Sequence, residues 1–147
     1  MTKRIVFLFL SVMWMSLIFY FSSQTADISG ASSGGIALKI IKLFVDSPSP
    51  ELVGIFETII RKIAHFTEYA VLAILLYQTM RSFNISTNKA FLSVIIAIVY
   101  AITDEVHQHF VPGRACRAYD VLIDSFGSIS GYYISKAFYV FKSKKYH

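Results

Sequence analysis

Four long apolar runs limit the folds open to this sequence. Residues 5–21 carry no charged side chain, and residues 64–80, 90–106 and 121–141 carry only a few, near their ends. A hydrocarbon layer about 30 Å thick needs roughly 20 helical residues to cross it. The strict alternation of a membrane β-barrel strand is absent. The runs therefore predict one all-α polytopic membrane domain over residues 1–147, with four transmembrane helices.

Composition favours a membrane protein over a soluble domain. Charged residues make up 16% of the chain and hydrophobic residues 55%, whereas a typical soluble domain has about 25% charged residues. This hydrophobicity excludes a disordered chain, and the single cysteine excludes a disulfide framework. Residues 5–21 follow Lys3 and Arg4, as in a signal peptide, but they exceed the usual apolar region of about 7–15 residues and no Ala-x-Ala site follows. We therefore expect an uncleaved first span.

The distribution of charge predicts the orientation. With the N-terminus inside, the inner segments hold eight basic residues and no acid: Lys3, Arg4, Arg81, Lys89, Lys136, Lys142, Lys144 and Lys145. All nine acids and the other six basic residues fall on the outer side. Because short loops rich in Lys and Arg stay in the cytoplasm, both termini are predicted to be cytoplasmic. The net charge of +5 is then an orientation signal and a contact for the lipid bilayer, and no nucleic-acid partner is expected.

The segment between the first two spans combines turn residues with one amphipathic stretch. Residues 22–25 and 29–35 are rich in Ser and Gly, which predicts loops. Residues 36–45 place apolar side chains on one side and two lysines nearer the other, which predicts a short helix on the outer membrane surface. A Pro-rich turn follows, and one helix is then expected to run from residue 51 to residue 80.

Polar and ionisable residues gather at the outer end of three predicted spans. Within each span they recur every three or four residues and so lie on neighbouring positions of the helix surface. Charges near the hydrocarbon usually face the interior of a helix bundle and pair with one another, so we expect one polar pocket at this end. The residues are Arg61, His65 and Glu68 on the second span, Asp104, Glu105, Gln108 and His109 on the third, and Arg117, Asp120 and Asp124 on the fourth.

The fourth span continues as a stripe of small residues. Gly127 and Ser128 follow Asp124 by three and four residues, and Gly131 and Ser135 follow at further steps of four. Small residues at this spacing let two helices approach closely. Asp124 is therefore expected to face a partner helix and not lipid.

These groups also have a purely structural interpretation. Arg61 and Lys62 could anchor a helix at the membrane interface, and the whole set could be an ion-paired network that fixes helix packing. Cys116 is interpreted as an incidental small residue, although two arginines lie near it. The chain has no HExxH or paired-cysteine motif, so Mg²⁺ or Ca²⁺ suits it better than zinc. Asp120 and Asp124 are the candidate ligands for such a divalent cation, and the cofactor is otherwise left open.

Four sequence blocks, in this order, resemble the VanZ-like family of small bacterial membrane proteins. They are WMSLIFYFSSQ (14–24), RKIAHFTEYAVL (61–72), AITDEVHQHFVPGR (101–114) and DVLIDSFGSISG (120–131). The resemblance implies a four-span protein of the bacterial cytoplasmic membrane, linked in some members to lowered teicoplanin sensitivity, and it supplies no agreed reaction. It marks as functional Ser22, Ser23, Gln24, Arg61, Lys62, His65, Glu68, Tyr69, Asp104, Glu105, Gln108, Arg114, Asp120, Asp124, Gly127 and Gly131.

The first functional hypothesis is a binding or masking protein. The outer pocket would engage a phosphate-bearing lipid or a lipid-linked cell-wall precursor, since guanidinium groups match phosphate oxygens in a bidentate way. The candidate residues are Arg61, Lys62, Arg114 and Arg117 for the phosphate, with Gln108, Ser22, Ser23 and Gln24 as further substrate-binding residues.

The second hypothesis is a membrane-embedded enzyme that transfers or hydrolyses phosphoryl or acyl groups of a lipid-linked substrate. Asp104 or Glu105 would act as general base, and His65 would shuttle a proton while Glu68 orients it. The two candidate metal ligands would hold an ion that bridges a phosphate. A proton pathway is disfavoured because the inner halves of the spans lack ionisable residues other than Lys136. A scaffold role stays open.

Overall fold

The computed structural model describes residues 2–86 and 88–145. In this part of the chain the elements are α1 (Thr2–Ser22), α2 (Ala26–Ile41), α3 (Pro50–Ser82), the 3-10 helix η1 (Lys89–Phe91), α4 (Leu92–Gln108) and α5 (Ala118–Lys145). The described residues contain no β-strand, which confirms the all-α prediction.

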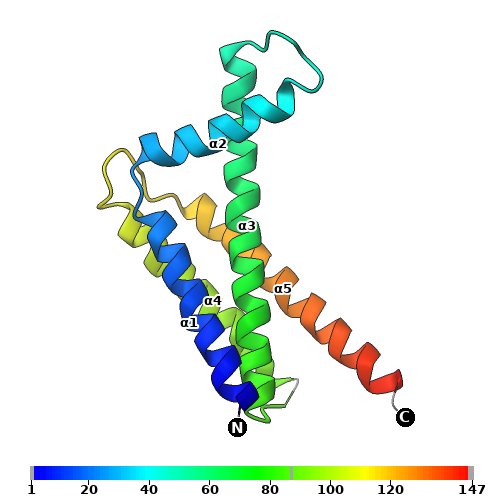
Figure 1. The fold of residues 1–147 in the computed structure, drawn as a ribbon. Helices are drawn as coiled ribbons and strands as arrows, with labels where there is room; N and C mark the ends of the chain where they lie inside the picture. The colour runs from blue at the N-terminus through cyan, green and yellow to red at the C-terminus, as the bar shows by residue number, and fades with distance from the viewer. Residues whose placement is uncertain (1, 87, 146–147) are drawn as a thin grey trace.

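α3 is the central helix of the fold (Figure 1). It contacts α1, α2, α4 and α5. α1 and α4 run toward the end at which α2 crosses the other helices, while α3 and α5 run away from it. The start of α1 and the end of α5 both lie toward the opposite end, apart from each other (Figure 1). We call these two ends the α2 end and the terminal end.

α1 is strongly apolar and mostly exposed. Among the described residues it is the one helix that is long and apolar enough, by length and composition alone, to cross a membrane. Ile5, Phe9 and Tyr20 are each more than 60% exposed, whereas Ser11 and Ile18 are buried. Packing within the chain thus uses a narrow stripe of α1. The other three predicted spans lie within α3, η1 with α4, and α5, which carry ionisable residues toward the α2 end.

The prediction for the segment before α3 was partly wrong. Residues 29–35, predicted as a loop, are helical, and the helix predicted over residues 36–45 begins earlier and ends at Ile41. Leu43 and Phe44 follow it in a turn and are 76% and 84% exposed. The apolar surface expected here is therefore present, but it lies partly beyond the helix.

Packing against α3 explains why a Ser- and Gly-rich segment is helical. Gly30 and Gly34 of α2 face the carboxylate of Glu57 on α3, where a β-carbon would lie 3.3 Å and 3.6 Å from its oxygens. The hydroxyl of Ser33 donates to the carbonyl oxygen of Ser29 at 2.9 Å, so this polar group is satisfied inside the helix. Tertiary contacts override the weak helix propensity of Gly and Ser.

α3 confirms the prediction of one long helix over residues 51–80. It runs without interruption from Pro50 to Ser82. Ser49 caps its start, because the Ser49 side chain accepts a hydrogen bond from the backbone N–H of Leu52 at 3.2 Å. Proline at the first turn needs no backbone donor there.

The small residues of α5 pack against the backbone of α3, as the sequence predicted. α5 crosses α3 at an angle (Figure 1), and a β-carbon at Gly127 would overlap the carbonyl oxygen of Phe66. One turn further on, a β-carbon at Gly131 would overlap the carbonyl oxygen of Ala70. Hydrogen at these positions is what allows the two helix backbones to touch.

We expect Gly131→Ala to destabilise the protein by about 1–3 kcal/mol, the usual cost of overpacking. The added methyl group meets backbone atoms of Ala70, which cannot move aside as a side chain would. Gly54→Ala on α3 is the matched control, because its β-carbon meets nothing within 4 Å and alanine favours a helix. Thermal unfolding of the purified variants measures both effects. Equal unfolding temperatures for the two variants would contradict the packing described here.

Candidate ligand-binding site

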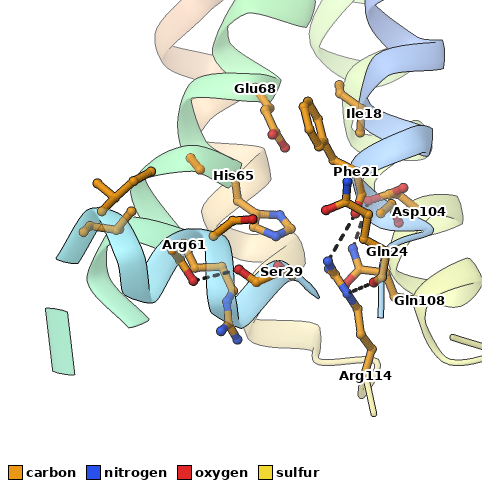
Figure 2. A pocket seen from close by; sticks show the side chains of 16 residues that line it. Ile18, Phe21, Gln24, Ser29, Arg61, His65, Glu68, Asp104, Gln108 and Arg114 are labelled. Carbon is orange, nitrogen blue, oxygen red and sulfur yellow. Dashed lines mark hydrogen bonds between the residues drawn. The ribbon is translucent and has the colours of Figure 1, made fainter. Parts of the chain in front are cut away.

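A cavity of about 360 Å³ lies at the α2 end, between α1, α2, α3 and α4. We call it the wide compartment (Figure 2). Its walls are partly apolar and partly charged. The lining residues are Ile18, Phe21, Ser22 and Gln24 from α1 and its exit, Ser29, Ser32, Ser33 and Ile36 from α2, Ile60, Arg61, Ala64, His65 and Glu68 from α3, Asp104 and Gln108 from α4, and Arg114 from the following loop.

Arg114 joins the two loops that border the cavity. Its guanidinium donates to the carbonyl oxygens of Gln24 at 2.9 Å and Phe21 at 3.2 Å, and to Oε1 of Gln108 at 3.1 Å (Figure 2). Burial, together with the charge of Arg61, lowers the pKa of Arg114 from its usual value. The preceding Gly113 has a φ of +76°, which favours glycine in this turn.

Three polar side chains face the wide compartment with unused hydrogen-bonding capacity. Oδ2 of Asp104 accepts from Nε2 of Gln108 at 3.1 Å, but Oδ1 of Asp104 has no partner among the described residues. The hydroxyl of Ser22 likewise has none. Both residues are only 4% exposed. The carboxylate of Glu68 points into the same space (Figure 2). Buried polar atoms of this kind are available to a ligand.

A second cavity, of about 70 Å³, adjoins the first. We call it the narrow compartment. Three arginines line it: Arg61, Arg114 and Arg117. Within the described part of the chain no carboxylate pairs with Arg114 or Arg117, whereas Arg61 pairs with Glu57 on the same helix. The two compartments share five lining residues, namely Ser29, Arg61, His65, Gln108 and Arg114.

His65 lies next to a fully buried acid, Asp124. Nδ1 of His65 lies 3.5 Å from Oδ1 of Asp124 on α5, and Asp124 is 0% exposed. The sequence analysis gave the orienting role to Glu68, which the structure places in the wide compartment instead. The stripe of glycines positions Asp124, because it brings the start of α5 against α3.

Several predicted site residues lie outside both compartments. Lys62 donates to Oδ1 of Asp120 at 2.8 Å and lies over the ring of Tyr119. Ser23 is exposed, and its hydroxyl donates to a backbone carbonyl of α1. Oε2 of Glu105 accepts the backbone N–H of Arg117 at 2.8 Å, so Glu105 fixes the start of α5. Lys62 and Glu105 therefore lie outside the compartments but hold Asp120 and Arg117, which line the narrow one.

The donor set does not fit the predicted divalent-cation site. Asp120 lies against Lys62, and Asp124 lies against His65, so the two carboxylates have separate partners. Across residues 2–86 and 88–145, no group of three or more His, Cys, Asp or Glu side chains is arranged to hold a metal ion. The expectation that Asp120 and Asp124 jointly bind a metal gains no support.

The sequence analysis missed the contribution of α2 to the cavity. Ser29, Ser32, Ser33 and Ile36 follow at i, i+3, i+4 and i+7, which is the spacing of one helix face. That spacing could have revealed them. The abundance of Ser and Gly in the segment suggested a loop and hid the pattern.

Comparison with known proteins finds one match. The model of a family described as VanZ/LLP1 matches residues 7–140. No curated protein and no solved structure matches the chain.

Proposed function

The chain belongs to the VanZ/LLP1 family, and from this premise we propose that it is a multi-pass protein of the bacterial cytoplasmic membrane that binds the phosphate group of a lipid-linked envelope molecule at its α2 end. The observation that carries the proposal is the narrow compartment, which Arg61, Arg114 and Arg117 line. It opens beside a wider, partly apolar compartment.

Phosphate is the ligand group that suits the narrow compartment best. Guanidinium groups match phosphate oxygens geometrically and stay charged. Asp120 also lines this compartment, but Lys62 pairs with it and offsets its charge. Nε of Arg61 is buried with no partner among the described residues, so it has a hydrogen bond to give.

The wide compartment suits the organic part of a lipid. Ile18, Phe21, Ile36 and Ile60 supply apolar wall, and Ile36 is itself 51% exposed. The wall therefore continues onto the outer apolar surface of α2. A site that joins apolar walls to a few convergent polar groups is typical of small-molecule binding.

Four membrane spans with cytoplasmic termini form part of the proposal. Large apolar side chains are exposed along α1, α4 and α5, as a lipid environment requires, and the two termini lie at the same end (Figure 1). The basic residues predicted to face the cytoplasm fall at that end. Exposed Leu43 and Phe44, close to Lys42, suit contact with the outer leaflet beside α2.

A thiol-labelling experiment tests this orientation. Cys116 is the one cysteine in the sequence, and it is exposed at the α2 end. We expect a membrane-impermeant maleimide to label it in intact spheroplasts. The matched control combines Cys116→Ser with Lys142→Cys near the terminal end, which should be labelled only after the cells are opened. The reverse pattern would place the site in the cytoplasm.

Arg117→Gln tests phosphate binding directly. The Arg117 backbone N–H holds Glu105 and remains, so the change removes the guanidinium with little effect on the fold. A hydrogen bond to a charged group contributes about 1.5–3 kcal/mol, so Kd should rise roughly 10- to 150-fold. The probe is a phosphonate analogue of phosphatidic acid, titrated into protein held in phosphatidylcholine nanodiscs.

Arg4→Gln, at the terminal end, is the control for this titration. Its guanidinium donates to the carbonyl oxygen of Ser82 at the terminal end, away from the site. Kd for the phosphonate should therefore not change. Masking of an envelope precursor would also lower teicoplanin sensitivity, so cells carrying Arg117→Gln should be as sensitive as cells without the protein. If wild-type protein does not bind the phosphonate, the proposed function is wrong.

A further inference from the structure

We infer that this site hydrolyses a phosphate monoester of a lipid alcohol, with His65 as the acid that protonates the departing oxygen. The inference rests on the proposed phosphate binding and adds a reaction to it. Three observations support it. His65 lines both compartments, Asp124 lies beside its Nδ1, and three arginines line the narrow compartment.

His65 lies where the scissile bond would be. It lines both compartments, and it comes from the wall that they share. With the phosphate in the narrow compartment and the alcohol in the wide one, the bridging ester oxygen falls between the two. His65 is the imidazole on that wall, and Figure 2 shows it pointing into the cavity between α3 and Arg114.

Asp124 gives the imidazole the orientation that an acid needs. Its Oδ1 lies 3.5 Å from Nδ1, it is fully buried, and neither of its carboxylate oxygens makes a hydrogen bond with a described residue. A carboxylate in this position keeps a proton on Nδ1 and stabilises the imidazolium form. Nε2 is then the nitrogen available to the ligand.

The three arginines favour a monoester over a diester. A monoester has three unesterified oxygens, and three arginines line the narrow compartment, of which Arg61 also pairs with Glu57. In phosphoryl transfer most catalysis comes from positioning and from stabilising charge on these oxygens. A diester would place a second organic group in a compartment of about 70 Å³ that has little room for it.

The reaction balances with water as the second substrate. The water oxygen bonds to phosphorus from the side of the narrow compartment while the bond from phosphorus to the lipid oxygen breaks. Nε2 of His65 gives its proton to the departing oxygen, which yields the free alcohol. The remaining water proton returns to His65 through solvent, and inorganic phosphate leaves. Oδ1 of Asp104 and the hydroxyl of Ser22, both unpartnered among the described residues, can hold hydroxyl groups of the alcohol.

The test compares two esters that differ in their need for an acid. An alkoxide leaves slowly unless it is protonated, whereas 4-nitrophenolate leaves without a proton. Full-length protein in phosphatidylcholine nanodiscs is given phosphatidic acid, a polyprenyl phosphate or 4-nitrophenyl phosphate. Released phosphate is measured in ¹⁸O-labelled water, which also reports cleavage at phosphorus. The two lipids distinguish a glycerol from a prenyl alcohol.

His65→Asn is the central variant, because the asparagine amide can still donate to Asp124 but no acid remains at the position of Nε2. We expect the rate with the lipid phosphate to fall by about 10²- to 10⁴-fold, the usual contribution of general acid catalysis, and the rate with the aryl ester to fall by less than about tenfold. Asp124→Asn should show the same contrast more weakly. His109→Asn, at an exposed histidine after α4, should leave both rates unchanged.

The outcomes separate this inference from the proposed function. Wild-type protein that binds the phosphonate lipid but releases no phosphate from either lipid overturns the hydrolysis and leaves phosphate binding intact. Equal losses for the two esters in His65→Asn overturn the acid role. If that variant fails to fold, Asp124→Asn and the ¹⁸O result on wild-type protein decide the question. Absence of phosphonate binding refutes both proposals.

Discussion

Arg114→Ala is expected to weaken ligand binding strongly and to loosen the α2 end. The Arg114 side chain lines both compartments and also joins the exit of α1 to the end of α4 through three hydrogen bonds. A hydrogen bond to a charged group contributes about 1.5–3 kcal/mol to the binding free energy. Losing the contact with phosphate should therefore raise Kd roughly 10- to 150-fold. The loss of three protein contacts should lower stability as well.

Arg114→Lys separates these two effects. Lysine keeps the charge but cannot reproduce the planar fork that reaches Gln24 and Gln108 together, so binding should be partly retained and thermal stability should still fall. Arg4→Ala is the matched control, since Arg4 also reaches a carbonyl oxygen from a neighbouring helix. Phosphonate titration and thermal unfolding report the two quantities. Wild-type binding in Arg114→Ala would show that the ligand lies elsewhere.

His65→Leu is expected to destabilise the protein by about 3–5 kcal/mol, because it leaves Asp124 buried without its partner. The double variant His65→Leu with Asp124→Leu removes the stranded carboxylate and should recover most of the lost stability. Unfolding of the purified variants in detergent measures this cycle. His109→Leu controls for replacing a histidine near the site and should change stability little, since His109 is exposed.

The coupling between the two changes decides this prediction. A double variant that is as unstable as the sum of the two single variants would mean that His65 and Asp124 do not interact. Catalysis should be lost in His65→Leu, in Asp124→Leu and in the double variant, because none of these keeps an oriented imidazole, whereas His109→Leu should keep it. The asparagine variants, which keep hydrogen-bonding groups, therefore address the reaction, and the leucine variants address the fold.

The helix content and the place of the site could be predicted from the sequence. The long apolar run and the Pro-rich turn before residue 51 were enough to predict α3, and the spacing of Arg61, His65 and Glu68 was enough to predict one common face. These features depend on neighbours within one helix. The number of helices that cross a membrane stays a prediction, since among the described residues α1 is the one helix long and apolar enough to do so.

Contacts between helices could not be predicted in the same way. Spacing along α3 suggested Glu68 as the partner of His65, but the true partner comes from α5 and depends on how far the two helices are shifted along each other. Gly127 and Gly131 fix that shift by meeting Phe66 and Ala70. α2 likewise packs against α3, a contact that no local propensity reveals.

The length of α3 has a consequence for how deep the site lies in a bilayer. At 1.5 Å per residue, its 33 residues extend about 50 Å, well beyond a hydrocarbon layer of about 30 Å. Measured from Ser82 at the terminal end, His65 lies roughly 25 Å along the same helix. In the proposed orientation, with Ser82 at the inner edge of the hydrocarbon layer, the imidazole therefore lies within about 5 Å of the outer edge of that layer. A lipid can then present its phosphate without leaving the bilayer, and water can approach from above.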